Sequence, residues 1–144
     1  MSNIPDRIDI EKGERETLYD TIDIFKNKSR KEQFLFAMAI GYKNKVKRKL
    51  ETREGFFLIK DMRLDDEALI NAIAINDSNS VEVLANKEDV FRIAEEYAHA
   101  GIKLLYDKIK STQHGSFEKQ FEKELFDAYN GLDLGEDCEK DTSG

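Results

Sequence analysis

The sequence predicts a mainly α protein, a compact domain of about five helices, and it leaves open one short β-hairpin near residues 45–60. The single proline, Pro5, lies near the start, so residues 14–130 contain no proline to interrupt a helix. Apolar residues in that stretch recur one helical turn apart, as they do on the buried face of a helix. With 144 residues, 40% of them hydrophobic, the chain is long enough to bury a core without a disulfide or a structural metal.

The first two predicted helices flank the start of a basic region. Apolar residues one turn apart predict a helix over residues 14–25, namely Leu18, Ile22 and Phe25. Ser29 and Glu32 have the spacing of a capping box, in which each side chain accepts a hydrogen bond from the other residue's backbone N–H. The apolar run over residues 34–40 then predicts a buried second helix that ends near Gly41.

The β-hairpin is predicted from residues that follow the second helix. Lysine alternates with other residues over 45–50, and residues 56–59 are rich in β-forming side chains. Because side chains alternate across a strand, every second residue of the first strand would share one exposed face. That face would carry Lys45, Lys47 and Lys49.

Two more helices are expected after the hairpin. The third begins at Asp65 or Asp66, either of which can cap it, and ends in the turn residues 76–80. The fourth is capped by Asn86 and runs from about residue 88 to residue 110. Its apolar stripe is wide enough to contact several neighbours, so this helix is expected to be the centre of the domain.

Tyr97 and Gly101 lie one turn apart on this fourth helix. A glycine there lets a neighbouring helix approach closely beside the tyrosine ring, which is a role in the core. The Tyr97 hydroxyl then needs a buried partner or a route to solvent.

The last predicted helix begins at Ser116 and has an apolar stripe. The stripe consists of Phe117, Phe121, Leu125 and Ala128. It either folds onto the same domain or binds another protein, and loop length alone does not decide between the two. We therefore expect a flexible N-terminus over residues 1–13, a single helical domain over 14–130 and a disordered acidic tail over 131–144.

Composition excludes several classes of protein. The single cysteine, Cys138, has no partner for a disulfide and cannot form a cysteine-based zinc site, which suits a reducing cytoplasm. The longest apolar run is far shorter than the roughly 20 residues of a membrane helix. The first residues lack the basic character of a signal peptide. We therefore expect a cytoplasmic protein without a membrane segment.

Positive charge is concentrated in one region of an acidic chain. Residues 26–53 contain ten Lys and Arg and only two Glu, although the net charge of the chain is −7. A local field of this sign is typical of a surface that binds nucleic-acid phosphates. The residues predicted to contact phosphates are Lys43, Lys45, Lys47, Arg48, Lys49 and Arg53, joined by Lys28, Arg30 and Lys31. The competing interpretation is a solvated surface whose cations pair with acidic helices of the same domain or with an acidic protein.

Catalytic motifs are not recognisable in the sequence. Glu95 and His99 are four residues apart on one helix face, but a third metal ligand is not evident, and a surface ion pair is the simpler interpretation. The glycines form no phosphate-binding loop, so no cofactor is expected. Without an evident third ligand, no bound metal is expected either. The protein is therefore expected not to be an enzyme. The enzymatic alternative is a small metal-dependent nuclease whose carboxylates, such as Glu51 or Asp61, converge beside the basic region.

Four segments of the chain match a recognisable family pattern. They are Phe36-Ala37-Met38-Ala39-Ile40-Gly41, Glu67-Ala68-Leu69-Ile70-Asn71-Ala72-Ile73-Ala74, Val83-Leu84-Ala85-Asn86 and, most distinctively, Phe91-Arg92-Ile93-Ala94-Glu95-Glu96-Tyr97-Ala98-His99-Ala100-Gly101-Ile102. Through them the stretch from about Phe34 to Ile109 resembles the Dnd-system-associated family, small accessory proteins encoded beside DNA phosphorothioation systems. The resemblance implies a cytoplasmic prokaryotic setting of DNA modification or defence. It supplies no catalytic residues.

These observations lead to two functional hypotheses. In the first, the protein is a non-catalytic, DNA-associated accessory protein that contacts phosphates through its basic region, in a sequence-tolerant and salt-sensitive way. In the second, it is an adaptor that docks Phe117, Phe121 and Leu125 on a larger subunit of a defence complex. Other defence-system proteins are expected as partners. The sequence does not distinguish DNA from RNA, nor a monomer from a homo-oligomer.

Overall fold

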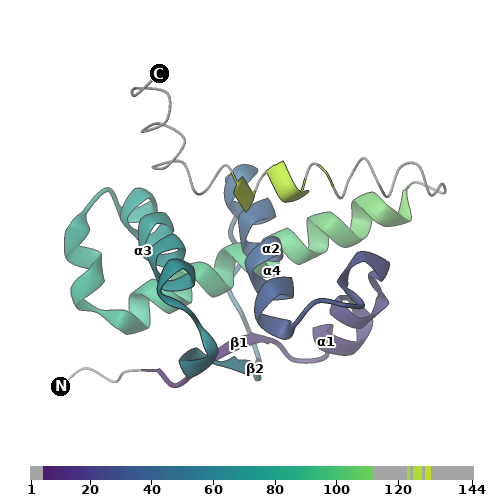
Figure 1. The fold of residues 1–144 in the computed structure, drawn as a ribbon, viewed down its shortest axis with the longest axis horizontal. Coiled ribbons are helices and arrows are strands. Elements are labelled where there is room, and N and C mark those ends of the chain that lie inside the picture. The colour runs from purple at the N-terminus through teal and green to yellow at the C-terminus, as the bar shows by residue number, and fades with distance from the viewer. Residues whose placement is uncertain (1–4, 112–122, 124, 128, 131–144) are drawn as a thin grey trace.

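The computed structural model describes residues 5–111 and, beyond them, residues 123, 125–127 and 129–130. The longer elements are β1 (Arg7–Glu11), α1 (Glu14–Thr17), α2 (Arg30–Lys43), β2 (Arg53–Leu58), α3 (Leu64–Ser78) and α4 (Lys87–Lys110) (Figure 1). Single 3-10 turns connect them, namely η1 (Tyr19–Thr21), η2 (Asp23–Phe25), η3 (Ile59–Asp61) and η4 (Val81–Ala85). The predicted fold class, mainly α with one small antiparallel sheet, is confirmed. None of the described helices is both long and apolar enough to span a membrane.

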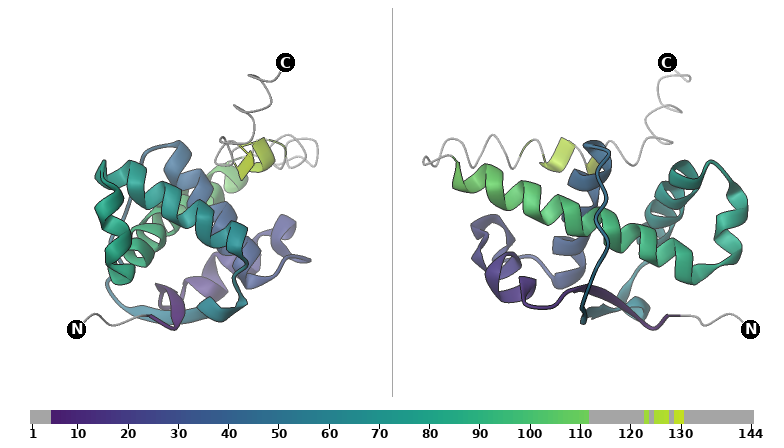
Figure 2. Two further views of the ribbon diagram at one scale, coloured as in Figure 1. Left: turned by 60° about the vertical axis from the view of Figure 1, so that its left-hand side comes forward. Right: turned by 180° about the vertical axis from the view of Figure 1, so that it is seen from behind.

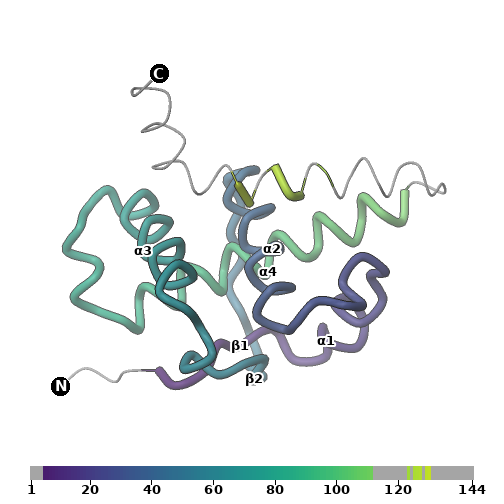
Figure 3. Tube along the Cα trace, in the orientation of Figure 1, coloured from purple at the N-terminus to yellow at the C-terminus, as the bar shows by residue number. Residues whose placement is uncertain are grey.

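The small sheet pairs the two ends of a long stretch of chain. Strand β2 pairs antiparallel with β1, with Arg7 opposite Leu58 and Glu11 opposite Arg53, and the tube drawing shows the two lying side by side (Figure 3). The predicted partner of this strand, residues 45–50, forms no strand. Pairing with β1 wins because it buries two isoleucines in the core, Ile8 and Ile10.

Strand β1 corrects the prediction that the N-terminus is flexible. Residues 7–11 were expected to be flexible, but they alternate apolar and polar side chains, which is the pattern of a half-buried strand. Residues 5–13 are therefore part of the folded domain.

Helices α2 and α4 form the centre of the core and cross at two glycines. A Cβ placed on Gly101 would lie 2.7 Å from the backbone nitrogen of Gly41, and one on Gly41 would lie 2.8 Å from the carbonyl carbon of Tyr97. The close approach predicted at Gly101 is confirmed. The Tyr97 hydroxyl finds its partner in α3, donating to Asp77 Oδ1 at 2.6 Å.

The predicted caps of α2 and α4 are confirmed, whereas some predicted helix lengths are not. The capping box of α2 is confirmed, with Ser29 Oγ accepting from the Glu32 N–H at 3.2 Å and Glu32 Oε1 accepting from the Ser29 N–H at 2.9 Å. The helix ends at Lys43, just beyond the predicted Gly41. The Asn86 cap of α4 is also confirmed, at 3.3 Å from the Asp89 nitrogen.

The other predicted helix boundaries need correction. The first helix was expected to span residues 14–25, but α1 has four residues and the chain continues as the 3-10 turns η1 and η2. Those tighter turns direct three large side chains into the core, namely Tyr19, Ile22 and Phe25. Helix α3 begins at Leu64, and Asp66 stabilises its start by accepting from the Arg63 N–H at 2.9 Å.

The described residues near the C-terminus are helical and pack on the same chain. Leu125 is only 2% exposed and belongs to the hydrophobic core, and the Tyr129 ring lies 5.2 Å from the Phe36 ring of α2. The prediction that Leu125 is available to a partner protein is therefore wrong for the folded chain. Phe117, Phe121 and the predicted tail over residues 131–144 lie outside the described residues.

Candidate nucleic-acid interface

The basic residues that follow α2 lie on an extended segment that crosses α4. We call residues 44–52 the basic strap. The view from behind shows it running across α4 on its way from α2 to β2 (Figure 2, right). Lys45 adopts a left-handed conformation, with φ of 58°, which turns the chain away from α2. The strap is therefore not the strand that was predicted.

Backbone hydrogen bonds hold the strap against the helices beneath it. The Val46 N–H donates to the Gly41 carbonyl and the Arg48 N–H donates to the Glu96 carbonyl, both at 3.0 Å. An extended segment with such contacts keeps its side chains on a defined path. The side chains of residues 43–49 are all exposed.

An acidic side chain from β1 fixes the far end of the strap. The Glu11 carboxylate accepts hydrogen bonds from the backbone N–H groups of Glu51 at 2.7 Å and Thr52 at 2.9 Å. Burial opposes ionisation of Glu11, but these two bonds and the positive charges of His99 and Arg48 together outweigh it, so the pKa of Glu11 is lowered. Glu11 was not predicted as a functional residue, because residues 1–13 were thought to be flexible.

His99 of α4 fixes the middle of the strap. Its Nδ1 lies 3.1 Å from each of the carbonyl oxygens of Arg48 and Lys49. Its Nε2 lies 3.4 Å from a carboxylate oxygen of Glu14 and 4.0 Å from one of Glu11. The ring is 6% exposed, so these groups form its immediate environment.

Four of the nine predicted phosphate contacts have carboxylate partners within the protein. Lys47 pairs with Asp77 at 3.0 Å, and Arg53 pairs with both Asp9 and Glu95. The other two pairs are Arg30 with Asp20 and Lys31 with Asp66, each at 2.8 Å. The competing interpretation of the basic region, internal pairing of its cations, is thus correct for these residues. Their positive charge is largely compensated where they stand.

The structure also separates the predicted residues into two groups. Lys28, Arg30 and Lys31 lie at the start of α2, whereas Lys43 and the strap lie at its other end. A helix of 14 residues is about 20 Å long. The predicted single basic ridge is therefore two regions, and only the one at the strap keeps several uncompensated cations.

These uncompensated cations are the candidate interface. Within the described residues, none of the four takes part in an ion pair, and all four are exposed: Lys43, Lys45, Arg48 and Lys49. Arg48 also lies close enough to Glu11 for their charges to attract. Extended chain advances about 3.3 Å per residue, so residues 45–49 cover about 13 Å, or roughly four base-pair steps of a duplex.

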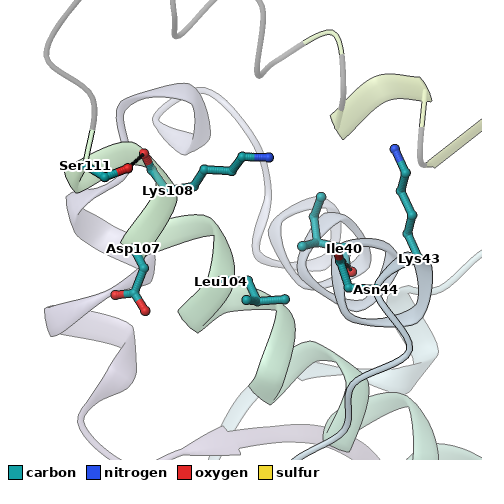
Figure 4. Close-up of a pocket in the computed structure, with 7 residues that line it drawn as sticks. All are labelled: Ile40, Lys43, Asn44, Leu104, Asp107, Lys108 and Ser111. Atoms are coloured by element: carbon teal, nitrogen blue, oxygen red, sulfur yellow. Dashed lines mark hydrogen bonds between the residues drawn. The ribbon is translucent and has the colours of Figure 1, made fainter.

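A hollow adjoins this surface at the C-terminal ends of α2 and α4. It has a volume of about 590 Å³, with Ile40 and Leu104 between the two helices and the side chains of Lys43 and Lys108 at its rims (Figure 4). Lys43 thus stands between the hollow and the strap.

A second polar cluster lies where the strap enters β2. Glu95 accepts from the Asp9 N–H at 2.8 Å and from the Arg53 guanidinium, and Asp9 accepts from Arg53 at 3.0 Å and from Arg7 at 2.8 Å. Burial raises the pKa of Glu95 to about 7, although the Asp9 N–H and the Arg53 charge both favour its ionised form. Glu95 and His99 are therefore both buried, and the prediction that they form a surface pair is wrong.

The arrangement of acidic residues bears on the nuclease alternative. Among the described residues, no three His, Cys, Asp or Glu side chains converge as they would around a metal ion. Glu51 and Asp61, named as carboxylates for such a site, are both exposed. The described residues therefore contain no metal site that would support the nuclease alternative.

The structural role of His99, Glu11 and Glu14 was missed in the sequence. One signal was available, because residues 7–11 alternate as a strand does and a strand places Glu11 at a fixed position. The contact between His99 and the strap carbonyls had no signal, since it joins residues about 50 positions apart through backbone atoms.

Comparison with protein families gives one result. The family described as DNA sulphur modification system-associated protein 4 matches residues 14–127, a longer stretch than the motifs between Phe34 and Ile109 indicated. No curated protein and no solved structure matches the chain.

Proposed function

The chain belongs to the family of DNA sulphur modification system-associated protein 4, and from this we propose that it is a non-catalytic accessory protein that contacts DNA phosphates through the basic strap. The family connects the chain with a DNA modification system. The strap and the adjoining Lys43 supply the chemistry that such a role needs, exposed cations of which four form no ion pair with a carboxylate of the described chain.

One observation carries this proposal. Lys43, Lys45, Arg48 and Lys49 are exposed without an ion-pair partner among the described residues, while the neighbouring cations Lys47 and Arg53 are paired. The chain has more acidic than basic residues, with a net charge of −7. Four cations within seven residues, none with a carboxylate partner in the described chain, are therefore a distinct feature. The strap is also held by backbone hydrogen bonds, so little ordering entropy is lost when an anion binds.

The expected binding is electrostatic and tolerant of sequence. Phosphate contacts position a protein on DNA without distinguishing bases. Four such contacts predict that the logarithm of the binding constant falls with the logarithm of salt concentration with a slope of about −3 to −4. Long-range repulsion between the acidic chain and DNA is itself screened by salt, so it offsets part of this dependence on salt.

Neutralising the strap tests the proposal. The triple variant Lys43→Gln, Lys45→Gln and Lys49→Gln is expected to bind duplex DNA more weakly and to reduce the salt slope by about 3, roughly one unit per phosphate contact. Fluorescence anisotropy of labelled duplex across a salt series measures both quantities.

A charge-matched control removes the same three charges elsewhere. Lys28, Lys60 and Lys87 form no ion pair among the described residues, none of them belongs to the strap, and Lys28 lies at the opposite end of α2 from it. Their triple replacement by Gln is expected to leave the slope within one unit of the wild-type value. An equal loss of slope in both variants would mean that only net charge matters, and the strap would not be the site.

The same surface also suits an acidic protein of the modification system, and binding of DNA decides between the two partners. Absence of duplex binding by the wild-type chain at low salt would overturn the DNA proposal. The other adaptor surface, the stripe that includes Leu125, is not favoured, because Leu125 is buried in the core of its own chain. A cytoplasmic location and homo-oligomerisation stay predictions.

A further inference from the structure

The His99 ring lies between the basic strap and two acidic side chains. Nδ1 is 3.1 Å from the carbonyl oxygens of both Arg48 and Lys49. On the other side, Nε2 is 3.4 Å from the carboxylate of Glu14. The ring joins the middle of the strap to the N-terminal part of the domain.

The chemistry of these neighbours determines the protonation state that fits. A carbonyl oxygen and a carboxylate oxygen only accept hydrogen bonds, so each ring nitrogen needs its own hydrogen. Neutral imidazole carries one hydrogen and leaves one nitrogen facing an acceptor. The imidazolium form satisfies both sides, and its charge strengthens both contacts.

We propose that His99 is a positioning residue for the basic strap, and that its doubly protonated ring holds Arg48 and Lys49 in the place from which the strap contacts phosphate. The Glu14 carboxylate is a stronger acceptor than a carbonyl and keeps the hydrogen on Nε2, so the proton lost to solvent comes from Nδ1, which then no longer donates to the strap carbonyls. The strap then loosens from α4 while the helices keep their packing. This inference rests on the proposed function for its DNA-binding part, but the hold on the strap can be measured without DNA.

The charged groups around the ring favour its doubly protonated form. Glu14 faces it from α1 and Glu11 from β1, while Arg48 on the strap contributes a repelling positive charge. Burial lowers the pKa of His99, but the hydrogen bond and charge of Glu14, together with the carbonyl of Arg48, outweigh that effect, and the net direction is upward from 6.5.

The sign of the pH dependence follows from that direction. A histidine whose pKa is raised by folding contributes its full stabilisation below the pKa of the unfolded chain. The contribution is lost as pH rises through the higher pKa of the folded chain. Strap order, and with it affinity for DNA, is therefore expected to fall as pH rises from neutral to alkaline values.

Hydrogen exchange of the full chain, measured together with NMR titration of the His99 ring, tests the hold on the strap. The amide protection of residues 46–52 is expected to drop about tenfold across the pH at which His99 loses its proton, after correction for the intrinsic rate. Glu14→Gln removes the facing charge and is expected to move both transitions together to lower pH. Unchanged protection while His99 titrates would overturn the proposal.

His99→Gln separates positioning from general stability. Its amide group still donates one hydrogen bond but does not titrate, so strap protection is expected to be lower than in the wild type at neutral pH and independent of pH over this range. Circular dichroism checks that the variant is folded. Strap protection in His99→Gln with the pH dependence of the wild type would show that another group, such as Glu95, is responsible, and would overturn the role of His99.

Anisotropy with duplex DNA over the same pH range tests the functional part. The wild type is expected to lose affinity with the midpoint of the His99 transition, and His99→Gln is expected to show no such step. If DNA does not bind at any pH, the proposed function fails, whereas the exchange experiment still confirms or overturns the hold of His99 on the strap. If DNA binds without a step at this midpoint, the positioning role in binding is overturned.

Discussion

Gly101→Ala is expected to lower the free energy of unfolding by about 3 kcal/mol or more, at the upper end of what overpacking of a core usually costs. The added methyl group would overlap the Ala37 carbonyl and lie 2.7 Å from the Gly41 nitrogen. Both are backbone atoms of α2, which cannot rotate away as a side chain can. The two central helices must therefore move apart, and side chains packed between them lose contacts.

Thermal unfolding followed by circular dichroism measures this effect. A loss of about 3 kcal/mol corresponds to a decrease in Tm of roughly 10 °C for a chain of this size. Gly55→Ala is the matched control, because its Cβ would meet only the flexible side chain of Arg7 at 3.1 Å. Its Tm is expected to stay close to that of the wild type. Equal Tm values for Gly101→Ala and the wild type would contradict the described crossing of α2 and α4.

Arg53→Met is expected to destabilise the fold by about 2–3 kcal/mol without reducing the salt slope of DNA binding. The change leaves Glu95, 3% exposed, and Asp9, 9% exposed, without their shared cation. Breaking a buried ion pair from one side typically costs about 3–5 kcal/mol, and the lower figure applies here because Arg53 itself is half exposed. Chemical denaturation gives the loss of stability, and anisotropy gives the slope.

The stability of the wild type depends on pH through Glu95, and Arg53→Met is expected to change that dependence. The pKa of Glu95 is about 7 in the folded chain, against 4.5 unfolded, so the folded state holds its proton to higher pH and stability falls as pH rises between these values. Without the Arg53 charge, that pKa rises further and the loss extends above neutral pH. Adding Glu95→Gln to Arg53→Met is expected to restore part of the stability and to flatten the profile. A reduced salt slope in Arg53→Met would contradict the assignment of Arg53 to the fold.

Local features of this fold were accessible from the sequence. The α2 capping box depends on Ser29 and Glu32, three residues apart, and such short-range chemistry leaves a direct pattern. The wide apolar stripe of α4 and the glycine that admits α2 were also recognisable. The family was identified from the motifs between Phe34 and Ile109 and is confirmed by the match over residues 14–127.

Long-range pairing was not accessible in the same way. Residues 53–58 carry the composition of a strand, but their partner lies more than 40 positions earlier, and composition does not specify a partner. The same holds for the cations. Lys47 and Arg53 look like Lys45 and Lys49 in the sequence, and only the positions of Asp77, Asp9 and Glu95 in the fold distinguish paired from unpaired charge.

The most direct test of the central claim is to map the surface that DNA contacts. An amide NMR titration of the isotope-labelled chain with a short duplex at low salt reports each residue separately. We expect the largest shifts over residues 43–50 and small shifts for Lys28, Arg30 and Lys31 at the other end of α2. Largest shifts at the start of α2, or DNA binding with no response from the strap, would contradict this expectation.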